Sequence, residues 1–174
     1  MAEEKRTLGL LALDCAIGRA REAQTEGDEI SFFASVAEAV WWLTMLDETL
    51  WNQTRNEASY ESIRGESPGG VLLLGLRYAR NRQVHDSQVT GMQGNPLLGH
   101  DDADGDLWRW RSLGARGVPD YIPREGRWGK KGEQVYRDCL ATHEVLPTLH
   151  DAASFLGRWI GELTTEPVTR WAAR

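Results

Sequence analysis

The chain has 174 residues, 41% of them hydrophobic and 26% charged, and its formal net charge is −6. These values predict a single folded domain spanning residues 1–174 and argue against disorder outside the ends and one loop. Cys15 and Cys139 are too few for a disulfide framework, so we expect free thiols in a reducing cytoplasm. No apolar run follows the N-terminus as in a signal peptide, and the longest run, residues 71–76, is far shorter than the ~20 residues of a membrane span.

Positive charge is concentrated in the second half of this acidic chain. Residues 1–66 hold 6 Lys and Arg against 13 Asp and Glu, whereas residues 77–137 hold 11 against 8. The net negative charge argues against a protein that coats nucleic acid broadly. The local excess allows a cationic face for phosphates, and its alternative is a solvated arginine-rich loop.

Apolar residues at helical spacing predict two helices in the first third of the chain. The first covers residues 7–25, where Leu10, Leu13 and Ile17 recur at steps of three or four and Gly27 can end the helix. Ser31 is expected to cap the second helix, residues 32–56, whose wide apolar stripe implies contact with more than one neighbour.

A third helix is predicted to begin at Ser67 and Pro68, a pair that suits an N-cap and the first helical position. From Val71 to Ala79 this helix is apolar on nearly every side. We therefore expect it to lie inside the molecule or between two copies of it. It becomes polar only at Arg80.

Residues 86–127 are predicted to form a long irregular insertion that contains many glycines and an acidic cluster. Within it, residues 107–111 alternate apolar and basic side chains, which suits a short strand or an extended arm. Helices are expected again from residue 128 or 132 to 141 and over residues 145–163, followed by a tail at residues 164–174. The predicted fold is therefore all-α, a bundle of four or five helices with the insertion between the third and fourth.

The most informative motif is the hexad Arg-Asn-Arg-Gln-Val-His at residues 80–85. It places a permanent cation, an amide and an imidazole within about one and a half helical turns. Tyr78, Asn81 and His85 are spaced to share one helix face, with Arg80 on its flank. Arg followed by His at this distance is common by chance, but Asn directly after Arg lowers the chance expectation to about 0.01 in this composition.

Arg80, Asn81 and His85 lie at the polar end of a buried helix, and there they resemble the Arg-x(4–6)-His signature of the HEPN superfamily. Residues 75–81 are also similar to the helix of that family. The resemblance implies a four- or five-helix bundle, a homodimer, and RNA cleavage without a metal or cofactor. It further implies a toxin or an anti-phage effector with an antitoxin or defence-system partner, although some members are inactive binding modules.

These residue types suit cleavage of RNA by its own 2′-hydroxyl group. Two copies packed about a twofold axis would bring two arginines and two histidines to one groove. A neutral His85 would accept the 2′-hydroxyl proton, and a protonated His85 from the second copy would donate a proton to the leaving 5′-oxygen. Arg80 would hold the phosphate, Asn81 would orient His85 or bind the phosphate, and the product would be a 2′,3′-cyclic phosphate. The neighbours expected to contact the substrate are Arg77, Tyr78 and Arg82.

A second candidate RNA contact lies in the insertion, at Trp108, Arg109, Trp110 and Arg111. Indoles stack on unpaired bases, and interleaved guanidinium groups hold the phosphates between them. The alternative is an arm that packs against its own bundle or against a partner subunit, and the sequence leaves both open.

An acidic turn in the insertion resembles the start of a calcium loop, with Asp102, Asp104 and Asp106 at alternate positions. The loop positions that need glycine and a carboxylate hold Leu107 and Leu113 instead. We therefore expect a solvated turn and no metal.

The remaining histidines carry weaker predictions. Arg137 and His143 repeat the Arg–His spacing, but His143 follows a helix break. His100, His143 and His150 have no zinc-ligand spacing. The rival to the nuclease hypothesis is a non-catalytic helical dimer that binds a nucleotide or a protein, in which the hexad only caps helix carbonyls.

Overall fold

The computed structural model of the chain describes residues 2–54, 57–90, 98–100, 107–113 and 127–165. Helices account for most of these residues, so the predicted all-α class is confirmed. The α-helices are α1 (Ala2–Glu26), α2 (Glu29–Thr54), α3 (Glu57–Gly65), α4 (Pro68–Thr90), α5 (Arg127–Val135) and α6 (Val145–Thr165). A π-helical turn, η1 (Tyr136–Leu140), follows α5, and two short strands, β1 (Leu98–His100) and β2 (Trp108–Trp110), pair antiparallel.

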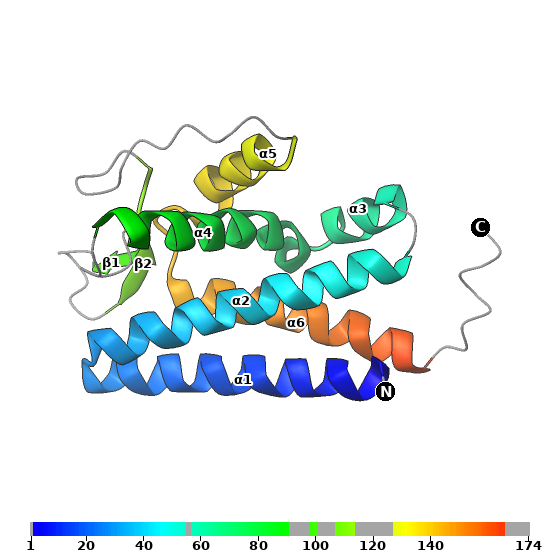
Figure 1. The fold of residues 1–174 in the computed structure, drawn as a ribbon, viewed down its shortest axis with the longest axis horizontal. Helices are drawn as coiled ribbons and strands as arrows, with labels where there is room; N and C mark the ends of the chain where they lie inside the picture. The colour runs from blue at the N-terminus through cyan, green and yellow to red at the C-terminus, as the bar shows by residue number, and fades with distance from the viewer. Residues whose placement is uncertain (1, 55–56, 91–97, 101–106, 114–126, 166–174) are drawn as a thin grey trace.

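The helices pack as a bundle around α4 and the α1–α2 hairpin (Figure 1). α1 and α2 run antiparallel, and α6 lies against both of them. α4 lies across α2 and α6, and α5 covers the outer side of α4. α3 lies at one end of α4, and β1 and β2 lie at the other end.

The turn between α1 and α2 differs from the prediction in its capping residue. Gly27 ends α1 with a positive φ of 71°, as its sequence position suggests. The cap of α2 is Asp28, whose carboxylate accepts hydrogen bonds from the Ser31 backbone N–H (3.0 Å) and hydroxyl (2.7 Å). These bonds lower the pKa of Asp28. The predicted cap at Ser31 is wrong, because Ser31 already lies in the first turn of α2.

Three other boundaries also differ from the predicted ones. α1 begins at Ala2 rather than residue 7, and α3 was not predicted at all. α4 begins at Pro68 as predicted, with the Val71 N–H bonded to the Ser67 carbonyl at 3.0 Å. It continues to Thr90, so residues 86–90 are helical and not part of an irregular insertion.

The prediction that the apolar part of α4 is buried is confirmed. Its leucines and Ala79 lie inside the molecule, where they pack against α2, α6, α5 and η1. The buried side chains of this segment are Leu72, Leu73, Leu74, Leu76, Tyr78 and Ala79.

The strand predicted at residues 107–111 is also present, as β2. Trp108 and Trp110 point to the same buried side of the strand, and Arg109 lies between them on the other. Backbone bonds join Trp110 to Thr142 and His143, which fasten β2 to the turn before α6. The structure does not describe residues 91–97, 101–106 and 114–126, which include the acidic turn, or residues 166–174 of the predicted tail.

Within the described part of the chain, α2 is the one helix long and apolar enough to cross a membrane by length and composition. The stretch is Glu29–Gln53, and 44% of its most apolar window is buried inside the molecule. A core helix of a bundle has the same composition, because it also presents apolar side chains to several neighbours.

The close approach of α4 to α6 gives a test of this packing. A Cβ atom on Gly69 would lie 2.2 Å from the backbone oxygen of Asp151, whereas one on Gly157 would meet nothing within 4 Å. We expect Gly69→Ala to lower the free energy of unfolding by about 1–3 kcal/mol. Gly157→Ala should raise it by up to about 1 kcal/mol, because alanine is the better helix former. Urea unfolding followed by circular dichroism measures both, and equal effects would contradict the packing.

Candidate functional site

A buried carboxylate joins three helices beside the hexad. Asp47 of α2 has a side chain that is 1% exposed, and it accepts hydrogen bonds from three donors. These donors are the hydroxyl of Tyr60 in α3, Nη1 of Arg64 in α3 at 3.4 Å and Nη2 of Arg77 in α4 at 2.9 Å. We call these four residues the Asp47 network.

The network is held in a mostly apolar setting. The Arg64 side chain is only 3% exposed, and its guanidinium lies over the rings of Trp51 (5.8 Å) and Tyr60 (5.3 Å). Burial, together with the charge of Asp47, raises the pKa of Tyr60 above its usual range. The phenol therefore stays protonated and remains a hydrogen-bond donor.

Arg80 lies one helical turn beyond Arg77, where α4 passes α2. Its Nη1 donates to the Thr44 hydroxyl at 3.0 Å, and its Nη2 lies 3.4 Å from Oδ1 of Asn81. Thr44 in turn donates to the Trp41 carbonyl at 2.9 Å. Arg80 is therefore half-buried and fixed against α2, whereas Asn81 is exposed.

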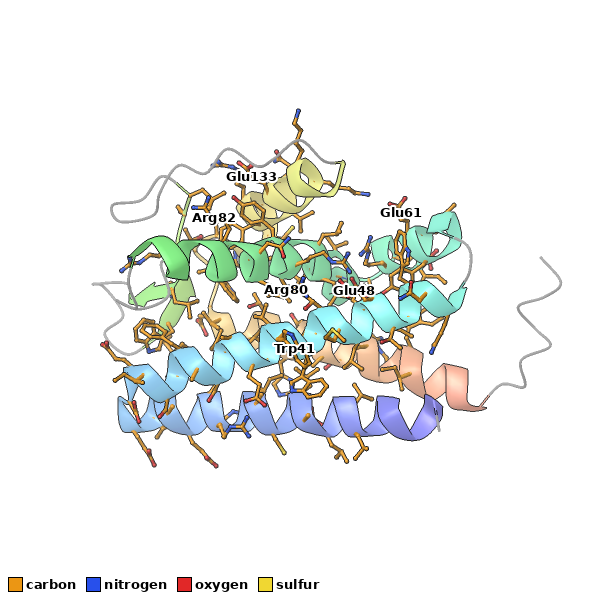
Figure 2. All side chains as sticks on the ribbon, in the orientation of Figure 1. Trp41, Glu48, Glu61, Arg80, Arg82 and Glu133 are labelled. Atoms are coloured by element: carbon orange, nitrogen blue, oxygen red, sulfur yellow. The ribbon has the colours of Figure 1, made fainter. Side chains whose placement is uncertain are left out.

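Figure 2 shows Arg80 on the side of α4 that faces α2, with Glu48 farther along the same contact between the two helices. Arg82 lies on the other side of α4, near α5 and Glu133. The guanidinium groups of the hexad thus point to two different sides of α4.

His85 belongs to α4 as the sequence predicts, four residues beyond Asn81. Residues four apart in an α-helix lie on the same face, so the backbone places His85 on the side of Asn81. The side chain of His85 lies outside the described part of the structure.

Tyr78 and Arg82, predicted to contact substrate, are buried on the α5 side of α4. Arg82 is 2% exposed, and the Tyr78 ring packs 5.6 Å from that of Tyr136. Burial raises the pKa of Tyr78, and the charge of Arg82 opposes that rise. Tyr78 and Asn81 are spaced toward one helix face as predicted, but they differ in accessibility, because α5 and η1 cover the tyrosine.

The two tryptophan rings of the arm, residues 107–111, are buried and therefore not accessible to bases. Trp110 is fully buried and donates from Nε1 to the Thr148 hydroxyl at 2.7 Å. Trp108 is buried too, and its ring stacks on Phe32 at 5.1 Å. The alternative of an arm packed on its own bundle is the arrangement present, and it corrects the stacking prediction for both tryptophans.

The two arginines of the arm differ in their exposure and in their contacts within the protein. Arg109 donates from Nη1 to the Thr142 carbonyl at 3.1 Å, which ties the arm to the turn before α6. Arg111 is exposed. Arg111 thus keeps its predicted access to a ligand, while Arg109 has a structural partner.

The other Arg–His pair is engaged locally. Arg137 bonds to the Glu133 carboxylate at 2.7 Å, one turn earlier, and Nδ1 of His143 lies 3.2 Å from the Ala141 carbonyl. Among the residues that the structure describes, no three His, Cys, Asp or Glu side chains form a group that could hold a metal ion. Cys15 and Cys139 are free thiols.

Sequence reasoning missed the residues that hold the site, above all Asp47 and Thr44. A signal was present in the apolar stripe of α2, where Val36, Val40 and Leu43 recur at helical spacing and the next step of four lands on Asp47. A carboxylate at a core position needs charged partners, and this requirement predicts a buried ion pair.

Comparison of the chain with protein families, with curated proteins and with solved structures finds no match.

The Asp47 network gives a prediction for stability. Asp47→Asn removes a buried charge and leaves the Arg64 guanidinium without its carboxylate, so we expect a loss of about 3–5 kcal/mol in the free energy of unfolding. The matched control is Glu38→Gln, which removes the ion pair with Arg19 between half-exposed side chains and should cost less than about 1 kcal/mol. Urea unfolding measures both variants, and similar small losses would show that the network contributes little.

Proposed function

We propose that the protein is a homodimeric, metal-independent endoribonuclease whose catalytic groups are Arg80, Asn81 and His85. The observation that carries the proposal is the position of Arg80 and Asn81. They sit side by side where α4 meets α2, with the guanidinium held by Thr44 and the amide exposed. A fixed guanidinium beside an exposed amide suits the binding of a phosphodiester.

The proposed chemistry follows from these groups and from His85. The neutral imidazole of His85 accepts the proton of the 2′-hydroxyl group, whose oxygen attacks the adjacent phosphorus. The bond from phosphorus to the 5′-oxygen breaks, and the protonated His85 of the second protomer donates a proton to that oxygen. Arg80 stabilises the charge on the non-bridging oxygens. The products are a 2′,3′-cyclic phosphate and a 5′-hydroxyl, and DNA is not cleaved because it lacks the nucleophile.

Residues outside the hexad have supporting roles in this proposal. Thr44 is a positioning residue for Arg80, and Arg77 fixes α4 against α2 through Asp47. The resemblance to the HEPN superfamily also supports a cytoplasmic toxin or anti-phage effector with an antitoxin or defence-system partner. The rival is a non-catalytic binding dimer, in which the hydrogen bond from Arg80 to Thr44 serves only to hold α4 against α2.

The activity is tested with purified protein, single-stranded RNA and excess EDTA. We expect the wild type to cleave, and Arg80→Ala and His85→Ala to lose at least about 100-fold in rate, because each removes a general acid–base or charge-stabilising group. The matched controls are Arg158→Ala and His150→Ala, exposed residues of α6 that should leave the rate unchanged. Equal rates for all variants, or cleavage that EDTA abolishes, would overturn the proposal and leave the binding dimer.

The dimer that the mechanism needs is proposed to form through the exposed apolar side chains beside Arg80. Trp41 and Met45 of α2 are 44% and 37% exposed, and Trp41 contributes the carbonyl that holds Thr44. Leu8 and Leu11 are exposed on α1, the helix antiparallel to α2. Exposed large apolar side chains on neighbouring helices are candidates for a protein–protein contact.

Sedimentation tests this contact. Trp41→Arg should convert the dimer to a monomer and abolish RNA cleavage, because each site needs the second protomer. Ile30→Arg is the matched control: Ile30 is the most exposed of the large hydrophobic side chains described (82%) but lies at the far end of α2 from Met45, so the dimer should persist. A monomeric wild type, or a dimer that survives Trp41→Arg, would exclude this interface.

A further inference from the structure

The Asp47 network opens to the surface at a pocket that the proposed phosphodiester chemistry does not use. The pocket has a volume of about 230 Å³ and is lined by Glu48, Trp51, Asn52 and Arg77. Pockets for drug-sized ligands are usually about 300–1,000 Å³, so this one fits a single flat ring system and not a larger molecule.

Its lining combines the groups that recognise a nucleobase. Trp51 offers an aromatic wall, Asn52 an amide, Arg77 a cation and Glu48 a carboxylate. Unpaired RNA bases are recognised in this way, by stacking on an aromatic side chain and by hydrogen bonds to the base edges. The positions of Trp51 and Arg77 are fixed: the Arg64 guanidinium lies over the Trp51 ring, and Arg77 is bonded to Asp47.

Glu48 determines which base fits. Its carboxylate is an acceptor only, and it forms an ion pair with Nη2 of Arg77 at 3.7 Å, a separation longer than a hydrogen bond. At this separation the ion pair leaves lone pairs of the carboxylate for the hydrogen-bond donors of a ligand. Guanine presents two adjacent donors, N1–H and the 2-amino group, whereas adenine, cytosine and uracil each present one donor beside an acceptor that a carboxylate repels. The Arg77 guanidinium, whose Nη2 is already bonded to Asp47, offers its other amino group to the O6 acceptor of the same base.

The pocket and Arg80 both lie along the contact between α2 and α4. Thr44 and Glu48 are one turn apart on α2, and Arg80 and Arg77 are three residues apart on α4. The pocket and the Arg80 guanidinium therefore lie at successive turns of the contact between α2 and α4. We therefore expect the base of a nucleotide whose phosphate is bound at Arg80 to reach this pocket.

We propose that this pocket binds guanine and directs cleavage to the 3′ side of guanosine. The inference rests on the proposed function for the identity of the phosphate that Arg80 holds. The pocket itself depends only on the lining residues and binds the base whether or not cleavage follows.

Calorimetric titration of the full-length protein with the 3′-monophosphates of the four nucleosides tests the pocket directly. We expect guanosine 3′-monophosphate to bind at least tenfold more tightly than the other three. Glu48→Gln should remove at least tenfold of that affinity, since the amide presents a donor to the donors of guanine. The control Glu38→Gln removes an exposed carboxylate from the same helix and should bind like the wild type. Equal binding of all four nucleotides, or a preference that survives Glu48→Gln, would overturn the proposal.

Mapping the cleavage sites on an RNA that contains all four bases separates this inference from the nuclease proposal. Selective binding that Glu48→Gln abolishes, with no cleavage by the wild type, supports the pocket and rejects the nuclease. Cleavage by the wild type with equal frequency after every base supports the nuclease and rejects the guanine pocket.

Discussion

The arrangement of this protein depends on one buried carboxylate, Asp47, in the second half of its most apolar helix. A charge in a low-dielectric interior is stable only when partners surround it, and Tyr60, Arg64 and Arg77 are those partners. Because they come from α3 and α4, the carboxylate fixes how both helices meet α2. The rotation of α4 about its axis follows, and with it the direction in which each residue of the hexad points.

The contact between Asp47 and Arg77 also determines which residues of the hexad are exposed farther along α4. With Arg77 held by Asp47, Arg80 emerges one turn later against Thr44, and Asn81 emerges into solvent. The same rotation turns Arg82 inward toward α5. A single interaction in the core thus separates the two guanidinium groups of the hexad into a surface group and a buried one.

The sequence predicts those parts of the fold whose signals are local. Ser67 and Pro68 mark the start of α4 without any tertiary information, and the alternation around Trp108 marks β2. α3 has no comparable signal, since its nine residues carry only two large apolar side chains and its packing depends on Tyr60 and Arg64 reaching Asp47. The sequence does allow the full length of α4, because neither proline nor glycine interrupts residues 76–90.

The candidate site was predictable in its residue types but not in its exposure. The spacing of Arg80, Asn81 and His85 identifies a polar segment at the end of a buried stretch. Whether Tyr78 and Trp110 are accessible depends instead on what covers them, which is η1 for the tyrosine and α6 for the tryptophan. Such cover comes from residues more than thirty positions away, and no local pattern encodes it.

The central claim is that two copies of this chain bring their hexads together at one groove. The most direct test is a spin-label distance between the two copies of Asn81→Cys, made in a background in which Cys15 and Cys139 are replaced. The 26-residue helix α2 provides the scale, since it is about 39 Å long at 1.5 Å per residue. The account predicts one narrow distance distribution centred at less than half that length, and an absent dipolar signal or a distance comparable with the whole helix would contradict it.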